Sequence, residues 1–393
     1  MKTLPDNPSL DHLRRQAKDL LTGMRDVQPE ASLADAQGSL AQQYGFHTWT
    51  DLKAEVDRRQ GRADYIAEHL ARAIAARYAL GQVTSPMRSL ARADEIGRPW
   101  SLETEQGRWA VRLLDECFDI DNVETDVRLQ EAASKAGVLL PAPVRSTSGA
   151  IVESIDGHNW RIHAWMDSGP PLSAPVNASI AAKVGVILAR LHSLALRAPN
   201  GIGWWHTHRP TEAEWHALAF RAQAMGADWA PSLTTAIPNL LSLDSSSGTT
   251  EPPAAILCHC NLGPGNVRLA PSDRLAVLGW EHAGGLPASW ELGSALMTWS
   301  MGQGGEGVST AGAHAMIDGY RSEASVLPPL DMTMFSSGVA AWLNYLFSQI
   351  AAALAASQAD DQRQLHRSVR HLLAHAPSRA DLQGLLDTVM VPS

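Results

Sequence analysis

The chain has 393 residues and a formal net charge of −9 at pH 7, and 45% of its residues are hydrophobic. That length predicts one sizeable domain plus a small one, and an acidic chain without a basic patch is not a typical nucleic-acid binder. No run approaches the ~20 apolar residues of a membrane span. The N-terminus lacks the apolar core of a signal peptide, and three cysteines suggest no disulfide framework, so we expect a cytoplasmic protein.

Residues 1–61 are predicted to form a helical module. A helix begins near Ser9 and a second one covers about 33–44, because leucines and alanines recur at helical spacing. Residues 44–53 read YGFHTWTDLK and resemble a Tyr-Gly-Phe-x-Ser-Trp-x-x-Leu-Lys signature of small bacterial helical modules. We interpret Phe46 and Trp49 as the core of this module. Its surface, residues 1–60, is a candidate docking site for a protein partner.

Residues 62–168 are predicted to form a small lobe around an antiparallel sheet. The segment 98–112 alternates like a β-hairpin, with Gln106 and Gly107 as its turn. We expect helices at 63–80 and 122–136 and strands at 84–93, 98–104, 107–114, 141–147 and 160–165.

Residues 169–393 are predicted to form a larger, mostly helical lobe. Pro170 and Pro171 begin it as a linker, and a helix over about 180–194 carries His192 near its end, which we interpret as a packed residue. Further along, residues 259–267 read HCNLGPGNV and residues 275–283 read LAVLGWEHA.

These two segments resemble the catalytic loop and the metal-binding strand end of the aminoglycoside phosphotransferase and choline kinase family. There the loop reads His-Gly-Asp-Leu-His-Pro-Gly-Asn and the strand end reads Ile-Asp-Trp-Glu-x-Ala. The resemblance covers about residues 62–355 and implies an α+β, protein-kinase-like fold of two lobes. It also implies that linker, hairpin and loop serve ATP, Mg²⁺ and an acceptor substrate.

The chain departs from that pattern at three charged positions. The loop Asp that accepts the substrate proton is Asn261, and the Asp that holds magnesium is Gly279. The hairpin Lys that holds the nucleotide phosphates is Arg112, which keeps the charge but not the ammonium geometry. His259 and Asn266 are retained. Because Mg²⁺ prefers anionic oxygen ligands, we expect neither ATP nor a metal to bind and no catalytic residue to function.

Two further carboxylates leave alternatives open. If the strand continues past Gly279, Glu281 points the same way as residue 279 and could hold a metal. In that case the protein would be an active phosphotransferase that uses Glu281 and Asn266 with ATP and Mg²⁺. Glu131, in a predicted helix, is a candidate ion-pair partner of Arg112 or a solvated helix residue.

Tryptophan use is unusual, with 13 Trp against 5 Phe and 5 Tyr. Core packing alone does not call for indole, whose N–H needs a partner. By the resemblance, the insertion before the loop and the late helices form the acceptor pocket, and an aromatic lining suits a flat, hydrophobic ligand better than a polycation. The alternative is that these aromatics are core residues. The candidate ligand-binding residues are Trp204, Trp205, His206, His208, Trp215, Trp280, Glu281, Trp290, Trp342 and Tyr345.

Cys258 and Cys260 flank His259, but two thiols without a second pair make a poor zinc site, so we expect none. The leading hypothesis is a catalytically degenerate family member that binds a small aromatic natural product and confers antibiotic self-resistance by sequestration. A DNA-reactive, azinomycin-like compound is the kind of ligand we expect. The rivals are the active phosphotransferase and a regulatory pseudokinase that acts through a protein partner.

Overall fold

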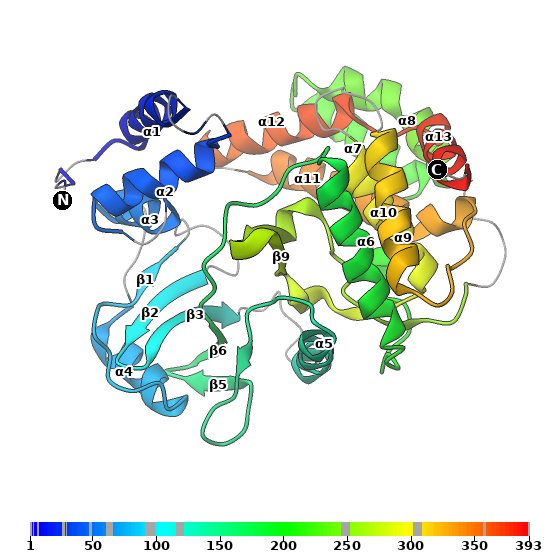
Figure 1. The fold of residues 1–393 in the computed structure, drawn as a ribbon. Coiled ribbons are helices and arrows are strands. Elements are labelled where there is room, and N and C mark those ends of the chain that lie inside the picture. The colour runs from blue at the N-terminus through cyan, green and yellow to red at the C-terminus, as the bar shows by residue number, and fades with distance from the viewer. Residues whose placement is uncertain are drawn as a thin grey trace. The chain divides into compact units, whose positions relative to one another are not determined.

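The computed structural model describes residues 2, 4–5, 8–25, 28, 30–46, 49–59, 66–90, 99–114, 122–244, 252–301, 309–356 and 359–391. The chain divides into two compact units, whose helices and strands are labelled in Figure 1. The sheet unit contains Met1–Glu131, Leu139–Pro170 and Leu269–Ala276. The helical unit contains Ala132–Val138, Pro171–Arg268 and Val277–Ser393.

The N-terminal module has its own small core within the sheet unit. Its helices are α1 (Leu10–Arg25), α2 (Leu33–Gln43) and α3 (Trp49–Arg59). Ser32 and Asp35 form a capping box that starts α2, and Gly45, at φ +83°, supplies the left-handed residue that ends it. Phe46 and Trp49 pack against the buried leucines of the module, which confirms the core interpretation.

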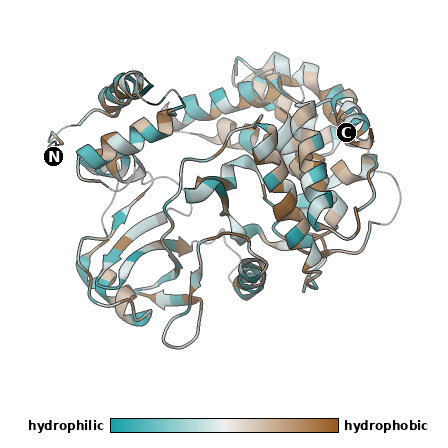
Figure 2. Cartoon of the chain, in the orientation of Figure 1, coloured by the Kyte–Doolittle hydropathy of each residue, from teal (hydrophilic) through white to brown (hydrophobic). Residues whose placement is uncertain are grey.

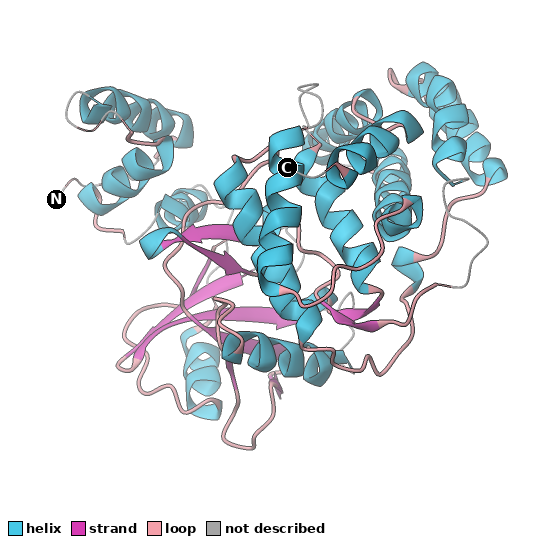
Figure 3. Cartoon of the chain, turned by 45° about the vertical axis from the view of Figure 1, so that its right-hand side comes forward, coloured by secondary structure: helices cyan, strands magenta, loops and turns pink. Residues whose placement is uncertain are grey.

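An antiparallel sheet of six strands forms the rest of the sheet unit (Figure 3). The order is β1-β2-β3-β6-β4, and β5 pairs with β6. Gly107 is the first residue of β3 and pairs with Thr104, so the turn is Glu105–Gln106 and not Gln106–Gly107 as predicted. The strands are β1 (Arg88–Ser89), β2 (Pro99–Thr104), β3 (Gly107–Leu114), β4 (Pro143–Val144), β5 (Val152–Ile155) and β6 (His158–Ala164).

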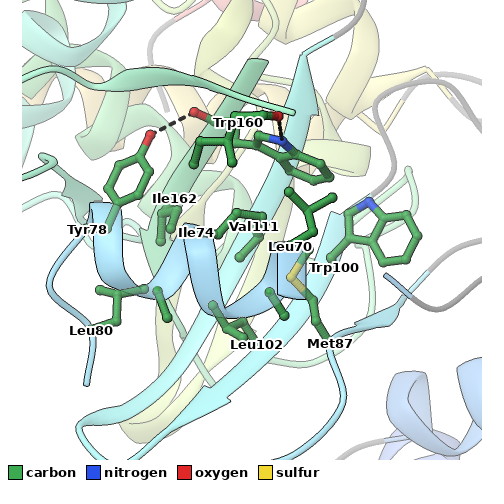
Figure 4. Packing of buried hydrophobic residues seen from close by; sticks show 13 residues of the cluster. Leu70, Ile74, Tyr78, Leu80, Met87, Trp100, Leu102, Val111, Trp160 and Ile162 are labelled. Carbon is green, nitrogen blue, oxygen red and sulfur yellow. Dashed lines mark hydrogen bonds between the residues drawn. The ribbon is translucent and has the colours of Figure 1, made fainter. Parts of the chain in front are cut away.

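Helix α4 (Glu68–Arg77) covers one face of this sheet. Its Leu70 and Ile74 pack against Trp100, Val111 and Ile162 of the strands, as Figure 4 shows. The Tyr78 hydroxyl at the edge of this core is paired, since it lies 2.7 Å from the carbonyl oxygen of Trp160. The opposite face of the sheet carries α5 (Val123–Lys135), whose Val127 packs with Leu114 of β3.

The helical unit is built around α6 (Ala178–Ser193) and α10 (Thr310–Glu323). A Cβ atom at Gly185 of α6 would lie 1.9 Å from the Met316 carbonyl oxygen, and one at Gly319 of α10 would lie 2.0 Å from that of Ala182. The two helices therefore touch backbone to backbone, which only glycine permits. The other helices are α7 (Glu212–Ala224), α8 (Ala230–Asp244), α9 (Ala288–Ser300), α11 (Ser336–Ala355), α12 (Ala359–Ala374) and α13 (Arg379–Met390).

Two short hairpins of strands frame the predicted loop. Strand β7 (Ile256–Cys258) leads into the loop and pairs with β10 (Gly284–Leu286). Strand β8 (Val267–Ala270) leaves the loop and pairs with β9 (Arg274–Val277).

One helical stretch, Met332–Ala355, is long and apolar enough to cross a membrane among the residues that the structure describes. The sequence did not predict this stretch, because the chain contains no continuous apolar run of that length. Its second part is α11, and Figure 2 colours the chain by the hydropathy of each residue. Helix α11 packs against α9 and α12, and it buries the polar residues Ser337 and Asn344. These features are those of a core helix of the helical unit.

Candidate functional site

The loop that follows β7 is held from inside by His259. This side chain is buried; its Nε2 donates to the Leu278 carbonyl oxygen at 2.9 Å, and its Nδ1 accepts the Asn261 N–H at 3.3 Å. Its ring meets Trp280 edge to face at 4.7 Å between centroids. Burial lowers the pKa of His259, so the imidazole is neutral at pH 7. Its role in this arrangement is to shape the loop.

A buried carboxylate anchors the start of the same loop. Cys260 adopts φ +62° and donates its N–H to Glu291 Oε1 at 2.6 Å. Glu291 Oε2 lies 2.9 Å from His192 Nε2, and His192 Nδ1 lies 2.9 Å from the Tyr320 hydroxyl. Burial favours the neutral acid, but the His192 contact and the Cys260 N–H outweigh it and lower the pKa of Glu291. His192 is thus a packed residue, as interpreted.

The position that should hold a metal is filled by Asn266. Gly279 adopts φ +79°, and a Cβ atom there would lie 2.6 Å from Asn266 Cγ. Asn266 donates from Nδ2 to the Asn261 carbonyl oxygen at 2.9 Å, and its own carbonyl accepts the Leu278 N–H at 2.8 Å. The retained amide therefore packs into the space where a side chain of residue 279 would begin.

The alternation argument for Glu281 is wrong. Strand β9 ends at Val277, Gly279 turns the chain through its left-handed conformation, and Trp280–His282 form a 3₁₀ turn. Residues 279 and 281 consequently do not share one side of a strand, because the period of two holds only in extended backbone. Glu281 is half-buried in this turn.

In the sheet unit, the ion pairs of α5 also differ from the prediction. Arg112 of β3 lies directly opposite Arg161 of β6. The carboxylate that α5 sends to the sheet is Asp126, which binds Arg161 at 2.6 Å with both side chains buried. Glu131 instead binds Arg145, at 3.3 Å. Of the two alternatives for Glu131, the structure favours the exposed helix residue, because its side chain is 47% exposed and binds Arg145.

The tryptophans before α7 form an exposed surface that we call the aromatic turn, residues 204–208. Trp204 is 61% exposed and Trp205 40%, and the Trp204 ring stacks on His208 at 4.4 Å with an interplanar angle of 15°. His206 Nδ1 lies 2.8 Å from the Ser337 hydroxyl. Burial lowers the pKa of His206, so this contact involves a neutral ring at pH 7.

A single buried residue of α11 holds the backbone of the aromatic turn. Asn344 is 3% exposed, and its Nδ2 donates to the carbonyl oxygens of Trp205 and His208, each at 3.0 Å. Sequence reasoning missed this residue. The available signal was a polar side chain within the apolar run 339–347 of α11, which predicts a buried hydrogen-bonding role.

The other predicted ligand-binding residues fall into two groups. Trp215 and Trp280 are core residues, 1% and 3% exposed, so their rings are not available to a ligand. Trp215 packs against Phe347, and Trp280 Nε1 donates to the Val277 carbonyl oxygen at 2.9 Å. Tyr345 is 45% exposed, whereas Trp290 and Trp342 are half-buried.

The model of a phosphotransferase enzyme family, APH, matches residues 88–326. A homoserine kinase of Xanthobacter autotrophicus is 24% identical over 225 residues, which is 56% of this chain. The match spans 66% of that relative's length, just under two thirds.

Two solved structures share the fold. Spectinomycin phosphotransferase in complex with ADP and spectinomycin superposes with a TM-score of 0.56 at 11% identity, covering 83% of this chain and 99% of that one. Amicoumacin kinase in complex with AMP-PNP superposes with a TM-score of 0.59 at 14% identity, covering 82% of this chain and 97% of that one. The predicted α+β fold with a sheet lobe, a helical lobe and N-terminal helices is confirmed.

Proposed function

Because the chain belongs to the phosphotransferase enzyme family, we propose that it keeps the fold and the ligand-binding role of that family but not phosphoryl transfer. In this proposal the protein binds a small aromatic natural product and protects its host by sequestration. The observation that carries the loss of chemistry is the packing of Asn266 against Gly279.

Magnesium is the first requirement that these residues do not meet. Phosphoryl transfer depends on metal ions that neutralise charge on the phosphates, and Mg²⁺ is usually held through carboxylates. Gly279 has no side chain, Asn261 is a neutral amide, and Asn266 is committed to the Asn261 carbonyl oxygen. Gly279, Asn261 and Asn266 thus offer neutral amides and no carboxylate, and one of the amides is already hydrogen-bonded to the loop, which does not suit a hard dication.

The aromatic turn is the support for ligand binding. Exposed apolar patches on a monomer often mark binding sites, and here Trp204 and Trp205 are adjacent and exposed. The contacts of Asn344 and Ser337 hold the aromatic turn on α11. The backbone of the turn is therefore fixed while its indole rings remain exposed to solvent. A rigid indole surface favours stacking with a planar ring.

Two carboxylates that could bind a polycation are already used in structural contacts, which favours an aromatic ligand. Glu214, close to the turn in sequence, caps α7 by accepting the Thr211 N–H at 2.7 Å. Glu291 is buried and bound to His192 and Cys260. Two of the acids that could have met ammonium groups therefore have structural roles. The antibiotics named with the two solved relatives support a natural-product ligand as the class to test.

The decisive experiment pairs nucleotide binding with natural-product binding. Calorimetry of the full chain with ATP and Mg²⁺ is expected to show no binding, and a screen of aromatic natural products by indole fluorescence is expected to give a ligand. Host tolerance to that ligand should then rise in proportion to the amount of protein, since sequestration is stoichiometric. Micromolar, magnesium-dependent ATP binding would contradict the proposal.

Variants of the aromatic turn locate the ligand. Trp204→Ala and Trp205→Ala should each weaken binding by about 1–3 kcal/mol if the rings stack on it. Phe220→Ala is the matched control, because Phe220 is also aromatic and 74% exposed but lies on α7, outside the turn. Equal losses in the control and the test variants would rule out a site at the turn.

A second candidate is an active phosphotransferase, favoured by the similarity to a homoserine kinase. It predicts ATP-dependent product formation that Glu281→Gln abolishes. The third, a pseudokinase with a protein partner, rests on the separate core of the N-terminal module. It predicts a partner in pull-downs that disappears when surface residues of α1 are changed.

A further inference from the structure

Three metal-ligating side chains meet in the core of the helical unit, behind the loop. His192 comes from α6, Cys258 from the end of β7 and Glu291 from α9. Their ligand atoms all lie within 4.8 Å of one another, and all three residues are buried. None of them is adjacent in sequence, which is why the chain by itself pointed only to the Cys258–His259–Cys260 run.

The side chains of this cluster are oriented by neighbours that do not take part in it. The Tyr320 hydroxyl lies 2.9 Å from His192 Nδ1 and leaves Nε2 facing Glu291. The Cys260 N–H occupies Glu291 Oε1, so Oε2 is the oxygen that faces His192. Hydrogen bonds of this kind, from outside the ligand set, fix the ring and carboxylate of metal ligands in proteins.

We propose that His192 Nε2, Cys258 Sγ and Glu291 Oε2 form a binding site for one zinc ion. Zinc–ligand distances of about 2.0–2.3 Å in a tetrahedron place ligand atoms roughly 3.4–3.6 Å apart. The His192–Glu291 contact, now 2.9 Å, opens by about half an ångström, and the sulfur moves inward by about 1.2 Å at most. A water molecule completes the tetrahedron.

The charges of the three side chains favour a bound zinc ion over the same cluster held by hydrogen bonds alone. A buried carboxylate is costly unless it is paired, and a thiolate plus a carboxylate neutralise one Zn²⁺. Zinc binding releases the thiol proton of Cys258 to solvent, and His192 binds the ion through an unprotonated Nε2 while its Nδ1 faces the Tyr320 hydroxyl.

The ion would join three elements at the point where the loop begins. Strand β7 ends at Cys258, and Cys260 already binds Glu291 through its backbone. Zinc would thus fix the loop against α6 and α9, which is a structural role. Cys260 is not a ligand in this site, because the Cys258 thiol, and not that of Cys260, lies within 4.8 Å of the ligand atoms of both His192 and Glu291. Cys258 Sγ gives up its hydrogen bond to the Leu286 carbonyl oxygen, now 3.3 Å, when it binds the ion.

This difference between the two thiols supplies a matched pair of variants. The full chain is stripped of metal with a chelator and titrated with zinc against a chromophoric competitor, then with Co²⁺. The wild type and Cys260→Ser are expected to bind one equivalent, to gain thermal stability and to show cobalt–thiolate charge-transfer absorption. Cys258→Ser is expected to bind at least 100-fold more weakly and to lose that absorption.

A change outside the ligand set tests the geometry independently. Tyr320→Phe removes the partner of His192 Nδ1 and should weaken zinc binding by about 10–100-fold. Affinity of the wild type should fall as the pH is lowered, because the thiol must lose a proton. If Cys258→Ser does not fold, Cys258→Ala and Tyr320→Phe replace it. No zinc uptake by the stripped wild type, or unchanged uptake by the Cys258 variants, would overturn the proposal.

Discussion

The loop after β7 and the aromatic turn lie in the same helical unit, but their side chains differ in what they contact. Those of the loop bind neighbouring backbone, whereas those of the turn remain exposed. In the loop, His259 accepts the N–H of Asn261 and Asn266 donates to the carbonyl oxygen of Asn261, so both side chains bind the loop's own backbone. In the aromatic turn, Asn344 of α11 satisfies the backbone, and the rings of Trp204 and Trp205 remain exposed. A segment whose polar groups close on themselves has little left for a ligand, whereas a segment held from behind keeps its side chains available.

The largest expected effect separates core tryptophans from exposed ones. Trp215→Ala should lower the free energy of unfolding by about 3–5 kcal/mol, because the ring is buried against Phe347. Trp204→Ala should change it by no more than ~0.5 kcal/mol. Denaturant unfolding followed by circular dichroism measures both. Comparable losses would show that the aromatic turn is part of the core.

The next effect tests the inward packing of the loop. Gly279→Ala should cost roughly 2–4 kcal/mol, from the left-handed backbone and from the contact with Asn266. Gly265→Ala is the control in the same loop, since nothing lies within 4 Å of its Cβ position. In the double variant Gly279→Ala with Asn266→Ala, the steric part should be relieved while the backbone part remains. Additive costs would mean that the two residues do not compete for space.

A smaller effect concerns the support of the aromatic turn. Asn344→Leu leaves the carbonyls of Trp205 and His208 without their donor and should cost about 1–3 kcal/mol. Amide hydrogen exchange should rise within residues 204–208, and fluorescence quenching of the indoles should increase. Tyr345→Ala, at the adjacent exposed position, should change neither. Unaltered exchange in Asn344→Leu would show that the turn is held by other contacts.

The last effect, which accumulates gradually with each pH unit, is a pH dependence of stability that both regions share. Burial lowers the pKa values of His259 and His206, so below pH ~6.5 the unfolded chain takes up protons that the folded chain does not. Stability should therefore fall as the pH drops from 7 to 5, by up to about 1.4 kcal/mol per pH unit for each histidine. Chemical unfolding at several pH values tests this. His259→Gln and His206→Gln should each flatten the slope, and an unchanged slope in both would contradict the assignment.

Much of the architecture could be predicted from the sequence. The alternation of residues 98–112 predicted the β2–β3 hairpin, and the leucine spacing predicted α1 and α2. The identities of Asn261 and Gly279 are also read directly from the chain. These features depend on local periodicity and on motif order, both of which a single sequence contains.

What the sequence left open were contacts between residues far apart in the chain. It left Glu131 open as an ion-pair partner of Arg112 or a solvated helix residue, and only the packing of α5 on the sheet decided that Asp126 binds Arg161. It grouped the tryptophans together, but only the neighbouring helices buried Trp215 and left Trp204 exposed. Periodicity defines the apolar side of an element and not the partner that covers it, since that partner is brought in by tertiary packing.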